Sequence, residues 1–497
     1  MASTVAIPGA DSAEPALAVE RRMAGPRLAT VLGTWQRPGA PAYVALADAL
    51  RAAVLSGAVP LTTRLPGERE LAQALGVSRT TTSATYDVLR DEGYLLSRRG
   101  SGTVTTLPSR PGARAVVAFG APSHDVVDLT VAAPSAPSAL HGAYLAALDA
   151  LPRHLAGTGY NPLGLPVLRE AVARRYTERG VPTTPNQVLV TSGAQEAIHL
   201  LVAAHVGTGD RVVVEHPTYP HAIDVARAAG ARPVPVPAGY DGLDVDLLES
   251  TVRQSAPRLV YLIPDNRNPT GTSLTAEQRE RVRALARRHR TAVVGDEALT
   301  DLTLDGPAPQ PWAGDGGTAG LVVTVGSASK SFWGGLRVGW VRAHPDLVSR
   351  LAAVRAHVDI AGAVLEQLVV AELLTNGEDL LERRRAALRG RRDLLVGLLR
   401  ERLPEWHVPV PRGGLSVWAG LGAPASTALA AVSLRYGVRV APGTAFGADG
   451  SFEQHLRVPF TEDETELRRA VDGLAAAWES LTSGGAVPTT TSWRAVV

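Results

Sequence analysis

The 497-residue chain has no cysteine and only one lysine, Lys330, against 49 arginines. The lack of cysteine excludes a disulfide scaffold, a thiolate metal site and a cysteine nucleophile. No apolar run approaches the roughly 20 residues that a membrane-spanning helix needs. Glu14 and Glu20 stand where a signal peptide would be apolar. We therefore expect a cytoplasmic protein with no membrane partner and no metal site.

An excess of charge of either sign is also missing, because the formal net charge is only +2. Total charge therefore does not indicate a nucleic-acid partner. The length predicts about three compact parts. Composition predicts a partly disordered N-terminal arm (1–40), a compact domain (41–106), a linker rich in Pro, Gly and Ala (107–126), a large domain (127–480) and a flexible tail (481–497).

The compact domain begins with a pattern of three helices. Apolar residues recur at helical spacing over residues 43–55. Residues 68–75 have the pattern of a second helix, and Gly76 is suited to end it. Ser78 is a suitable cap for a third helix over residues 79–92. Two short helices joined by a turn that contains glycine are typical of a helix–turn–helix.

The third helix and the residues after it complete the pattern. Ala84, Val88 and Leu89 are expected to face the core of this domain. Residues 94–98 and 103–105 have the pattern of two strands around a tight, glycine-containing turn. The sequence therefore predicts an α-rich helix–turn–helix with a β-hairpin wing.

Such a domain suits DNA. The third helix would begin with Arg79, Thr80 and Thr81, and free backbone N–H groups at a helix start accept phosphate, while arginine forms bidentate pairs with guanine. Arg98 and Arg99 would contact DNA from the wing. Small helical bundles also serve as interaction modules, and seven arginines against six acids in residues 41–106 do not decide between the two. The residues alone leave both readings open.

The run LPGERELAQALGVSRTTTSATYDVLRDEGYLLSRRGSGTVTT resembles the winged helix–turn–helix of the GntR family of bacterial regulators. This resemblance covers about 60 residues and implies binding to a double-stranded DNA operator. Thr82 stands where the family often has valine. The residue argument and the resemblance together give these candidate DNA contacts: Arg69, Ser78, Arg79, Thr80, Thr81, Arg98, Arg99 and Gly100.

The large domain contains five short, apolar runs rich in β-branched residues. They cover residues 187–191, 211–215, 259–263, 291–295 and 321–325. Continuous apolar runs of this kind are typical of parallel strands that are covered on both faces, and helical patterns separate most of them. The sequence therefore predicts an α/β domain with a mainly parallel sheet.

Polar residues follow each of these five strands. Because ligands of open α/β sheets bind at the carboxyl ends of the strands, we expect the polar residues to form one site. They include Gly193, Ala194, Gln195, Tyr219, Asn268, Asp296, Ser327 and Lys330.

Lys330 is the key member of this set. Arginine replaces lysine for solubility, ion pairs and many phosphate contacts, but it cannot supply a primary amine that forms an imine. A single lysine kept at a strand end therefore indicates Schiff-base chemistry. Chance survival of one lysine in an arginine-rich chain is the alternative.

Pyridoxal 5'-phosphate (PLP) makes the rest of the set coherent. Its phosphate needs backbone N–H groups, hydroxyls and a guanidinium, which residues 193–195, Ser327 and Arg337 can supply. Its pyridinium nitrogen needs an acid such as Asp296. Tyr219 can stack on its ring, and Asn268 can bond the ring oxygen.

The segment is also similar to fold-type I, class I aminotransferases over roughly 350 residues. The matching motifs are TSGAQEA, HPTYP, NPTG, GDEA, SASKSF, RGGLSVW and LRVPF. The resemblance implies a smaller C-terminal subdomain and makes Lys330 the internal-aldimine lysine. It gives the cofactor-binding roles above to Asp296, Asn268, Tyr219, Ser327 and Arg337. It also assigns the effector carboxylate to Arg457 and places Tyr160 in the site of a partner subunit.

One residue departs from the family pattern. The family usually has a tyrosine shortly after the aspartate of GDEA, and its hydroxyl bonds the ring oxygen of the cofactor. This chain has Leu299 there, which offers no donor. Cofactor capture through Lys330 should survive this change, whereas we expect transamination to be weak at most.

A GntR-type winged helix followed by an aminotransferase-like domain resembles the MocR subgroup of GntR regulators. The resemblance implies a homodimeric, PLP-dependent transcriptional regulator that senses PLP or an amine or amino-acid effector. The alternative is an active PLP-dependent aminotransferase that carries a DNA-binding head. A third reading is a DNA-binding protein whose large domain no longer holds the cofactor.

Overall fold

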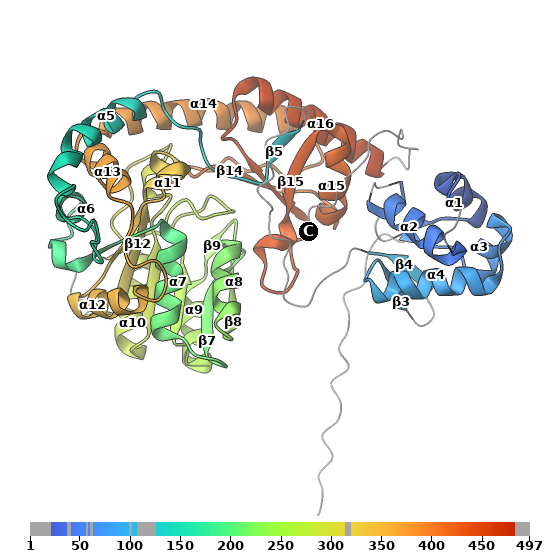
Figure 1. Cartoon of the computed structure of the whole chain (residues 1–497), viewed down its shortest axis with the longest axis horizontal. Helices are drawn as coiled ribbons and strands as arrows, with labels where there is room; N and C mark the ends of the chain where they lie inside the picture. The colour runs from blue at the N-terminus through green and yellow to red at the C-terminus, as the bar shows by residue number, and fades with distance from the viewer. Residues whose placement is uncertain are drawn as a thin grey trace, which may run out of the picture. The chain divides into compact units, whose positions relative to one another are not determined.

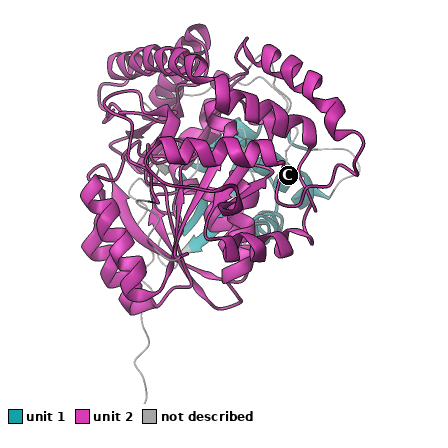
Figure 2. Ribbon diagram, turned by 90° about the vertical axis from the view of Figure 1, so that its left-hand side faces the viewer, with its two compact units in different colours: residues 1–113, 483–497 teal, residues 114–482 magenta. Residues whose placement is uncertain are grey.

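A computed structural model describes residues 21–36, 41–55, 58–59, 63–98, 102–106, 126–313 and 320–482. The chain divides into two compact units, one of residues 1–113 with 483–497 and the other of residues 114–482 (Figure 2). Within the described ranges no helix has both the length and the apolarity to cross a membrane.

The smaller unit contains the expected winged helix. Its helices are α2 (Ala42–Leu55), α3 (Glu68–Leu75) and α4 (Arg79–Asp91), and its hairpin is β3 (Leu95–Arg98) with antiparallel β4 (Gly102–Thr105). Gly76 ends α3 in the left-handed conformation at φ 67°, which glycine adopts without strain. Ser78 caps α4, because its Oγ accepts from the Thr81 N–H at 3.1 Å. The helix–turn–helix therefore forms where the sequence predicts it.

The buried face of α4 differs from the prediction. Leu89 is fully buried, but Ala84 and Val88 are only partly buried, and Thr82 and Thr85 take core positions instead. The hydroxyls of both threonines donate hydrogen bonds to backbone carbonyls there. The Thr82 hydroxyl donates to the Glu68 carbonyl at 2.9 Å, and that of Thr85 donates to the Tyr43 carbonyl at 3.2 Å. A hydroxyl with a backbone acceptor can be buried at little cost.

Residues before the winged helix add to its core. Strand β1 (Arg21–Arg22) pairs with β2 (Thr63–Arg64), which extends the small sheet to the order β1-β2-β4-β3. Helix α1 (Gly25–Leu32) buries Leu28 completely, and the Gly25 N–H donates to the Glu70 carboxylate at 2.8 Å. Part of the predicted arm is therefore ordered structure.

The larger unit is built on an eight-stranded sheet with the order β6-β13-β12-β11-β10-β7-β8-β9. All five predicted strands are present and run in the same direction, while β13 and β9 are antiparallel to their neighbours. The bounds are β6 (Val188–Thr191), β7 (Arg211–His216), β8 (Arg232–Gly239), β9 (Gly242–Leu243), β10 (Leu259–Leu262), β11 (Ala292–Asp296), β12 (Val322–Ser327) and β13 (Gly339–Arg342).

Helices cover both faces of this sheet (Figure 1). The helices are α5 (Leu140–Ala150), α6 (Pro166–Glu178), α7 (Ala194–His205), α8 (Pro220–Ala228), α9 (Val245–Ser255), α10 (Ala276–His289), α11 (Ala328–Ser331), α12 (Pro345–Arg355) and α13 (Val364–Asn376). In β7, Val212 and Val214 pack with α7, α8 and α12, while Val213 between them packs with α9 and α10. Coverage on both sides explains the continuous apolar strands.

A smaller subdomain follows in the same unit. Its sheet has the order β14-β16-β15-β5, formed by β5 (Val127–Leu129), β14 (Ser416–Gly420), β15 (Val438–Pro442) and β16 (His455–Pro459). The other elements are α14 (Glu378–Arg402), α15 (Ser426–Ser433) and α16 (Glu464–Thr482). Strand β5 pairs in parallel with β15 although some 300 residues separate them in the chain. The predicted α/β fold with a smaller C-terminal subdomain is confirmed.

Candidate functional site

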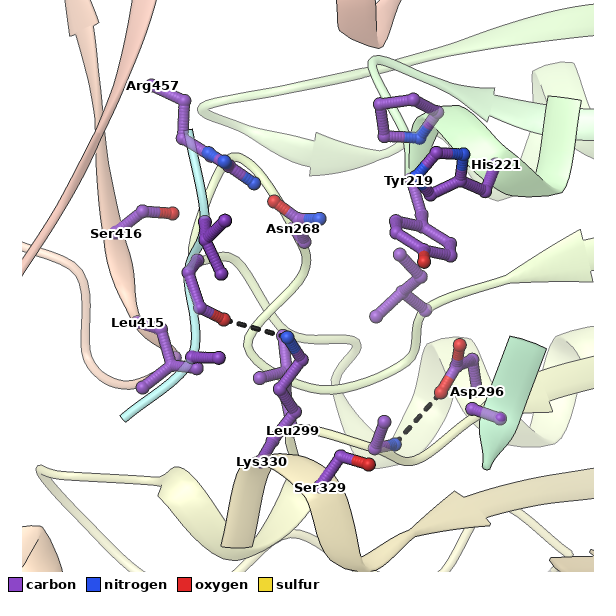
Figure 3. A pocket seen from close by; sticks show the side chains of 18 of the residues that line it. Tyr219, His221, Asn268, Asp296, Leu299, Ser329, Lys330, Leu415, Ser416 and Arg457 are labelled. Atoms are coloured by element: carbon purple, nitrogen blue, oxygen red, sulfur yellow. Dashed lines mark hydrogen bonds between the residues drawn. The ribbon is translucent and has the colours of Figure 1, made fainter. Parts of the chain in front are cut away.

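The carboxyl ends of the parallel strands open on a cavity of about 430 Å³. In Figure 3, labelled side chains from both subdomains surround it. Of the residues predicted for the cofactor or the effector, the following line the cavity: Ala194, Gln195, Tyr219, Asn268, Asp296, Ser327, Lys330, Arg337 and Arg457. The structure thus brings together groups that lie far apart in the sequence.

Lys330 lies on α11, directly after β12, and reaches the middle of the site (Figure 3). Its Nζ donates to the carbonyl oxygen of Ala132 at 2.8 Å. Burial lowers its pKa to about 8, and the nearby cations Arg457 and Arg337 contribute to the lowering while Asp296 opposes it. A lysine in these surroundings has a substantial neutral, nucleophilic fraction near neutral pH.

This lowered pKa predicts how cofactor capture depends on pH. Only the neutral amine attacks an aldehyde, so the rate of PLP capture by cofactor-free protein should rise with pH to a midpoint near 8. The neutral fraction, and with it the rate, should grow about 50-fold from pH 6 to pH 8. Stopped-flow absorbance measures it. Arg457→Gln removes a cation and should move the midpoint upward, whereas a wild-type midpoint near that of free lysine would contradict the assignment.

Asp296 ends β11 and has two fixed hydrogen bonds. Its Oδ2 accepts from the Tyr261 hydroxyl at 2.8 Å, and its Oδ1 accepts from the Ala298 N–H at 2.9 Å. Burial raises the pKa of this carboxyl, while both hydrogen bonds favour the charged form. A buried carboxylate needs a compensating cation, and a pyridinium nitrogen is such a partner.

The start of α7 forms a cradle suited to a phosphate. Gly193 has φ 97°, and a Cβ there would lie 3.2 Å from Nη2 of Arg337. Arg337 donates to the Ser192 carbonyl at 2.9 Å and keeps its guanidinium beside the first turn of α7. The first N–H groups of a helix have no partner within the helix, so they bind anions together with a guanidinium.

Several buried polar atoms at the cavity have no hydrogen-bond partner among the described residues. They are Oδ1 of Asn268, Oε1 of Gln195 and Nε of Arg457. Unsatisfied buried groups are costly, so a polar ligand that bonds these three atoms would be stabilised in the cavity. Together with the cradle, the Asp296 carboxylate and the amine of Lys330, they fit PLP.

Two further cavity residues, Arg457 and Leu299, bear on the chemistry of a bound ligand. Arg457 donates to the Thr130 carbonyl and lies 4.9 Å from the ring centroid of Phe446, and burial lowers its pKa to about 10, so it stays cationic at neutral pH. Leu299 is buried at the wall of the cavity, at the position where the family resemblance leads us to expect a tyrosine. Its side chain has no proton to offer to a ring oxygen.

The remaining predicted residues lie elsewhere. Tyr160 is 68% exposed and does not line the cavity of its own chain. In the winged helix, Arg69, Ser78 and Arg79 are exposed together with Thr80, and Thr81 is half-buried. Of Arg98 the structure describes only the backbone, and Arg99 and Gly100 lie outside the described residues.

The sequence did not point to all residues of the site. Residues 130–133 form part of the cavity wall, and their backbone carbonyls hold Lys330 and Arg457. Tyr261 supports Asp296 from the middle of β10. The signal for Tyr261 was a polar atom inside an otherwise apolar strand, because a buried tyrosine hydroxyl needs a partner. No local pattern distinguishes residues 130–133.

Comparisons with known proteins identify the family of each unit. The profile described as "Aminotransferase class I and II" matches residues 124–474, and that described as "Bacterial regulatory proteins, gntR family" matches residues 42–104. A 2-aminoadipate transaminase of Thermus thermophilus is 33% identical, over 64% of this chain and 81% of its own length. A probable rhizopine catabolism regulatory protein, MocR, of Rhizobium meliloti is 32% identical, over 74% of this chain and 78% of its own length.

A solved structure supports the same assignment. The α-aminoadipate aminotransferase LysN of Thermus thermophilus, in complex with N-(5'-phosphopyridoxyl)-L-leucine, has a TM-score of 0.67 and 29% identity, and the match covers 73% of this chain and 94% of that one. The predicted PLP-binding fold is thus confirmed. The chain belongs to the class I and II aminotransferase family and, with its GntR-type DNA-binding domain, has the architecture of the MocR-type transcriptional regulators.

Proposed function

We propose that this PLP-binding transcriptional regulator senses the cofactor itself, or an amine or amino-acid effector, through Lys330. The observation that carries the proposal is the single lysine of the chain, which lies with a lowered pKa in the cavity beside Asp296. When bound, PLP supplies an aldehyde that reacts reversibly with primary amines. A C=N bond forms to the amine and one water leaves, so an effector amine can compete with Lys330 for the aldehyde.

The other cavity residues would hold the cofactor in place. Residues 193–195, Ser327 and Arg337 would bind its phosphate, because backbone N–H groups and a guanidinium lie together there. Asp296 would pair with the pyridine nitrogen and Asn268 with the ring oxygen. Burial raises the pKa of Tyr219 to about 12, so its neutral ring would stack on the cofactor.

Arg457 would select the effector. It is buried and cationic, and its Nε has no hydrogen-bond partner among the described residues. A buried guanidinium with a free donor is suited to a carboxylate. An effector that carries both an amino group and a carboxylate therefore fits the cavity better than a simple amine does.

We assign the domains as predicted, with DNA binding in residues 41–106 and cofactor binding in residues 127–480. The active species would be a homodimer. Large apolar side chains of α5 and the segment after it are exposed, namely Leu145, Leu148 and Leu155, and Tyr160 follows them. Exposed apolar side chains that lie close together in the sequence favour burial against a second copy, where Tyr160 would reach the partner's site.

The test is a joint measurement on the purified full-length protein. With PLP it should show a visible absorbance band and should retard a fragment of its own upstream region in a gel. A colourless protein that binds no such fragment under any cofactor condition would overturn the proposal.

An assay with an amino donor and a keto acid separates the regulator from an active aminotransferase. Since Leu299 offers no hydroxyl, we expect turnover well below the roughly 1–1000 per second of ordinary enzymes. Turnover in that range would favour the enzyme.

A further inference from the structure

The segment of residues 130–133 forms one wall of the cavity and comes directly after strand β5. In Figure 3 a dashed line marks the hydrogen bond from Nζ of Lys330 to this segment. Two of its backbone carbonyls accept hydrogen bonds from cationic side chains: that of Ala132 from Lys330, and that of Thr130 from Arg457. The segment therefore binds the two residues to which we assign the cofactor and the effector.

The start of the segment is fixed from its other side. Asp128 accepts from both the backbone N–H and the hydroxyl of Thr130 through its Oδ1. Its Oδ2 pairs with Arg439 at 3.1 Å, on the neighbouring strand β15. The segment is thus held at Thr130 by Asp128 and by Arg457, and at Ala132 by Lys330.

Ligands that bind as proposed compete for these bonds. A neutral lysine amine has two N–H bonds, and condensation with an aldehyde replaces both by C=N and releases one water. The Ala132 carbonyl then loses its donor. A carboxylate at Arg457 competes in the same way with the Thr130 carbonyl, because a charged acceptor makes the stronger hydrogen bond.

In the sequence, this segment lies close to the residues that connect the two units. Residues 130–133 stand a few positions after residues 107–125, which connect the two units and lie outside the described residues. We propose that residues 130–133 are a ligand-sensing segment, whose carbonyls exchange partners when Lys330 and Arg457 engage their ligands and which passes this change to the connecting chain. The inference rests on the proposed function, because it requires Lys330 to be the residue that captures the cofactor.

Hydrogen exchange of the full-length protein with PLP or with pyridoxamine phosphate tests the first step. Pyridoxamine phosphate has an amino group in place of the aldehyde, so it leaves Lys330 free to bond Ala132. Backbone amides of residues 127–135 should exchange about fivefold faster with PLP, as expected for the loss of one hydrogen bond. In Lys330→Ala the contrast between the two ligands should vanish.

The visible absorbance band distinguishes a failure of the proposed function from a failure of the ligand-sensing segment alone. If PLP produces no band, the proposed function fails. If the band forms and exchange over residues 127–135 is the same with both ligands, the proposed function stands and the sensing segment is overturned.

DNA affinity tests the second step. Arg439→Gln removes the ion pair that holds Asp128 without touching a cavity residue, so PLP should bind normally. The ratio of operator affinities with PLP and with pyridoxamine phosphate should then move toward one. Arg469→Gln, which breaks an exposed pair with Glu466, is the matched control and should leave the ratio unchanged. If the wild-type ratio differs from 1 and Arg439→Gln leaves that ratio unchanged, transmission through this segment is contradicted.

Discussion

Replacing Lys330 with arginine should abolish the visible absorbance of the PLP-loaded protein completely. Arginine keeps the positive charge that Lys330 can carry beside Asp296, but its guanidinium does not form a stable imine with an aldehyde. Lys330→Ala should give the same loss. Because Lys330 is the only lysine, no second side-chain amine can replace it, and the apparent affinity for PLP should fall about 100-fold or more with the covalent bond.

Absorbance titration and equilibrium dialysis measure this effect. Arg383→Ala is a suitable control, because that residue is exposed on α14 and does not line the cavity. The control should bind PLP as the wild type does. A visible band of normal intensity in Lys330→Arg would show that the cofactor is not joined to Lys330.

The second large effect is expected at the start of the recognition helix. Arg79→Ala should weaken operator binding about 10- to 100-fold, which corresponds to the loss of one bidentate arginine–guanine contact of about 1–3 kcal/mol. The Arg79 side chain is 73% exposed, and the distance from its Nε to Glu68 is 3.7 Å. Such an exposed pair adds little stability, so the domain should stay folded.

Fluorescence anisotropy with an operator fragment at fixed salt measures this affinity. Arg383→Ala again serves as the control, since it removes one positive charge from a surface outside the winged helix. PLP binding should be unchanged in both variants. Equal operator affinity of Arg79→Ala and the control would mean that α4 does not read the DNA.

Much of the fold could be predicted because many single helices and strands have a clear local sequence pattern. The five parallel strands are buried on both faces, so each is a continuous apolar run, and Gly76 and Ser78 mark the turn between α3 and α4. The pairing of β5 with β15 could not be predicted, since a three-residue strand carries little signal and its partner is far away in the chain. The buried Thr82 and Thr85 were missed because a threonine hydroxyl can bond a carbonyl of its own helix, as both do here, and so enter the core without an apolar pattern.

The residues of the site also differ in whether the local sequence identifies them. Residues at the ends of the strands or just after them, such as Asp296 and Lys330, could be predicted because parallel strands place their carboxyl ends at one edge. The wall at residues 130–133 contributes backbone carbonyls, which any amino acid provides, so the sequence there contains no chemical signal. Arg457 was identified through the family resemblance, and the structure adds that its guanidinium lies against Phe446.

The central claim is that Lys330 joins covalently to PLP. Borohydride reduction of the PLP-soaked protein, followed by protease digestion and peptide mass mapping, tests it most directly, because reduction turns a C=N bond into a permanent link. We expect one modified peptide, and it contains Lys330. An unmodified Lys330 peptide after soaking and reduction would mean that the protein is a DNA-binding protein without a PLP-linked sensor.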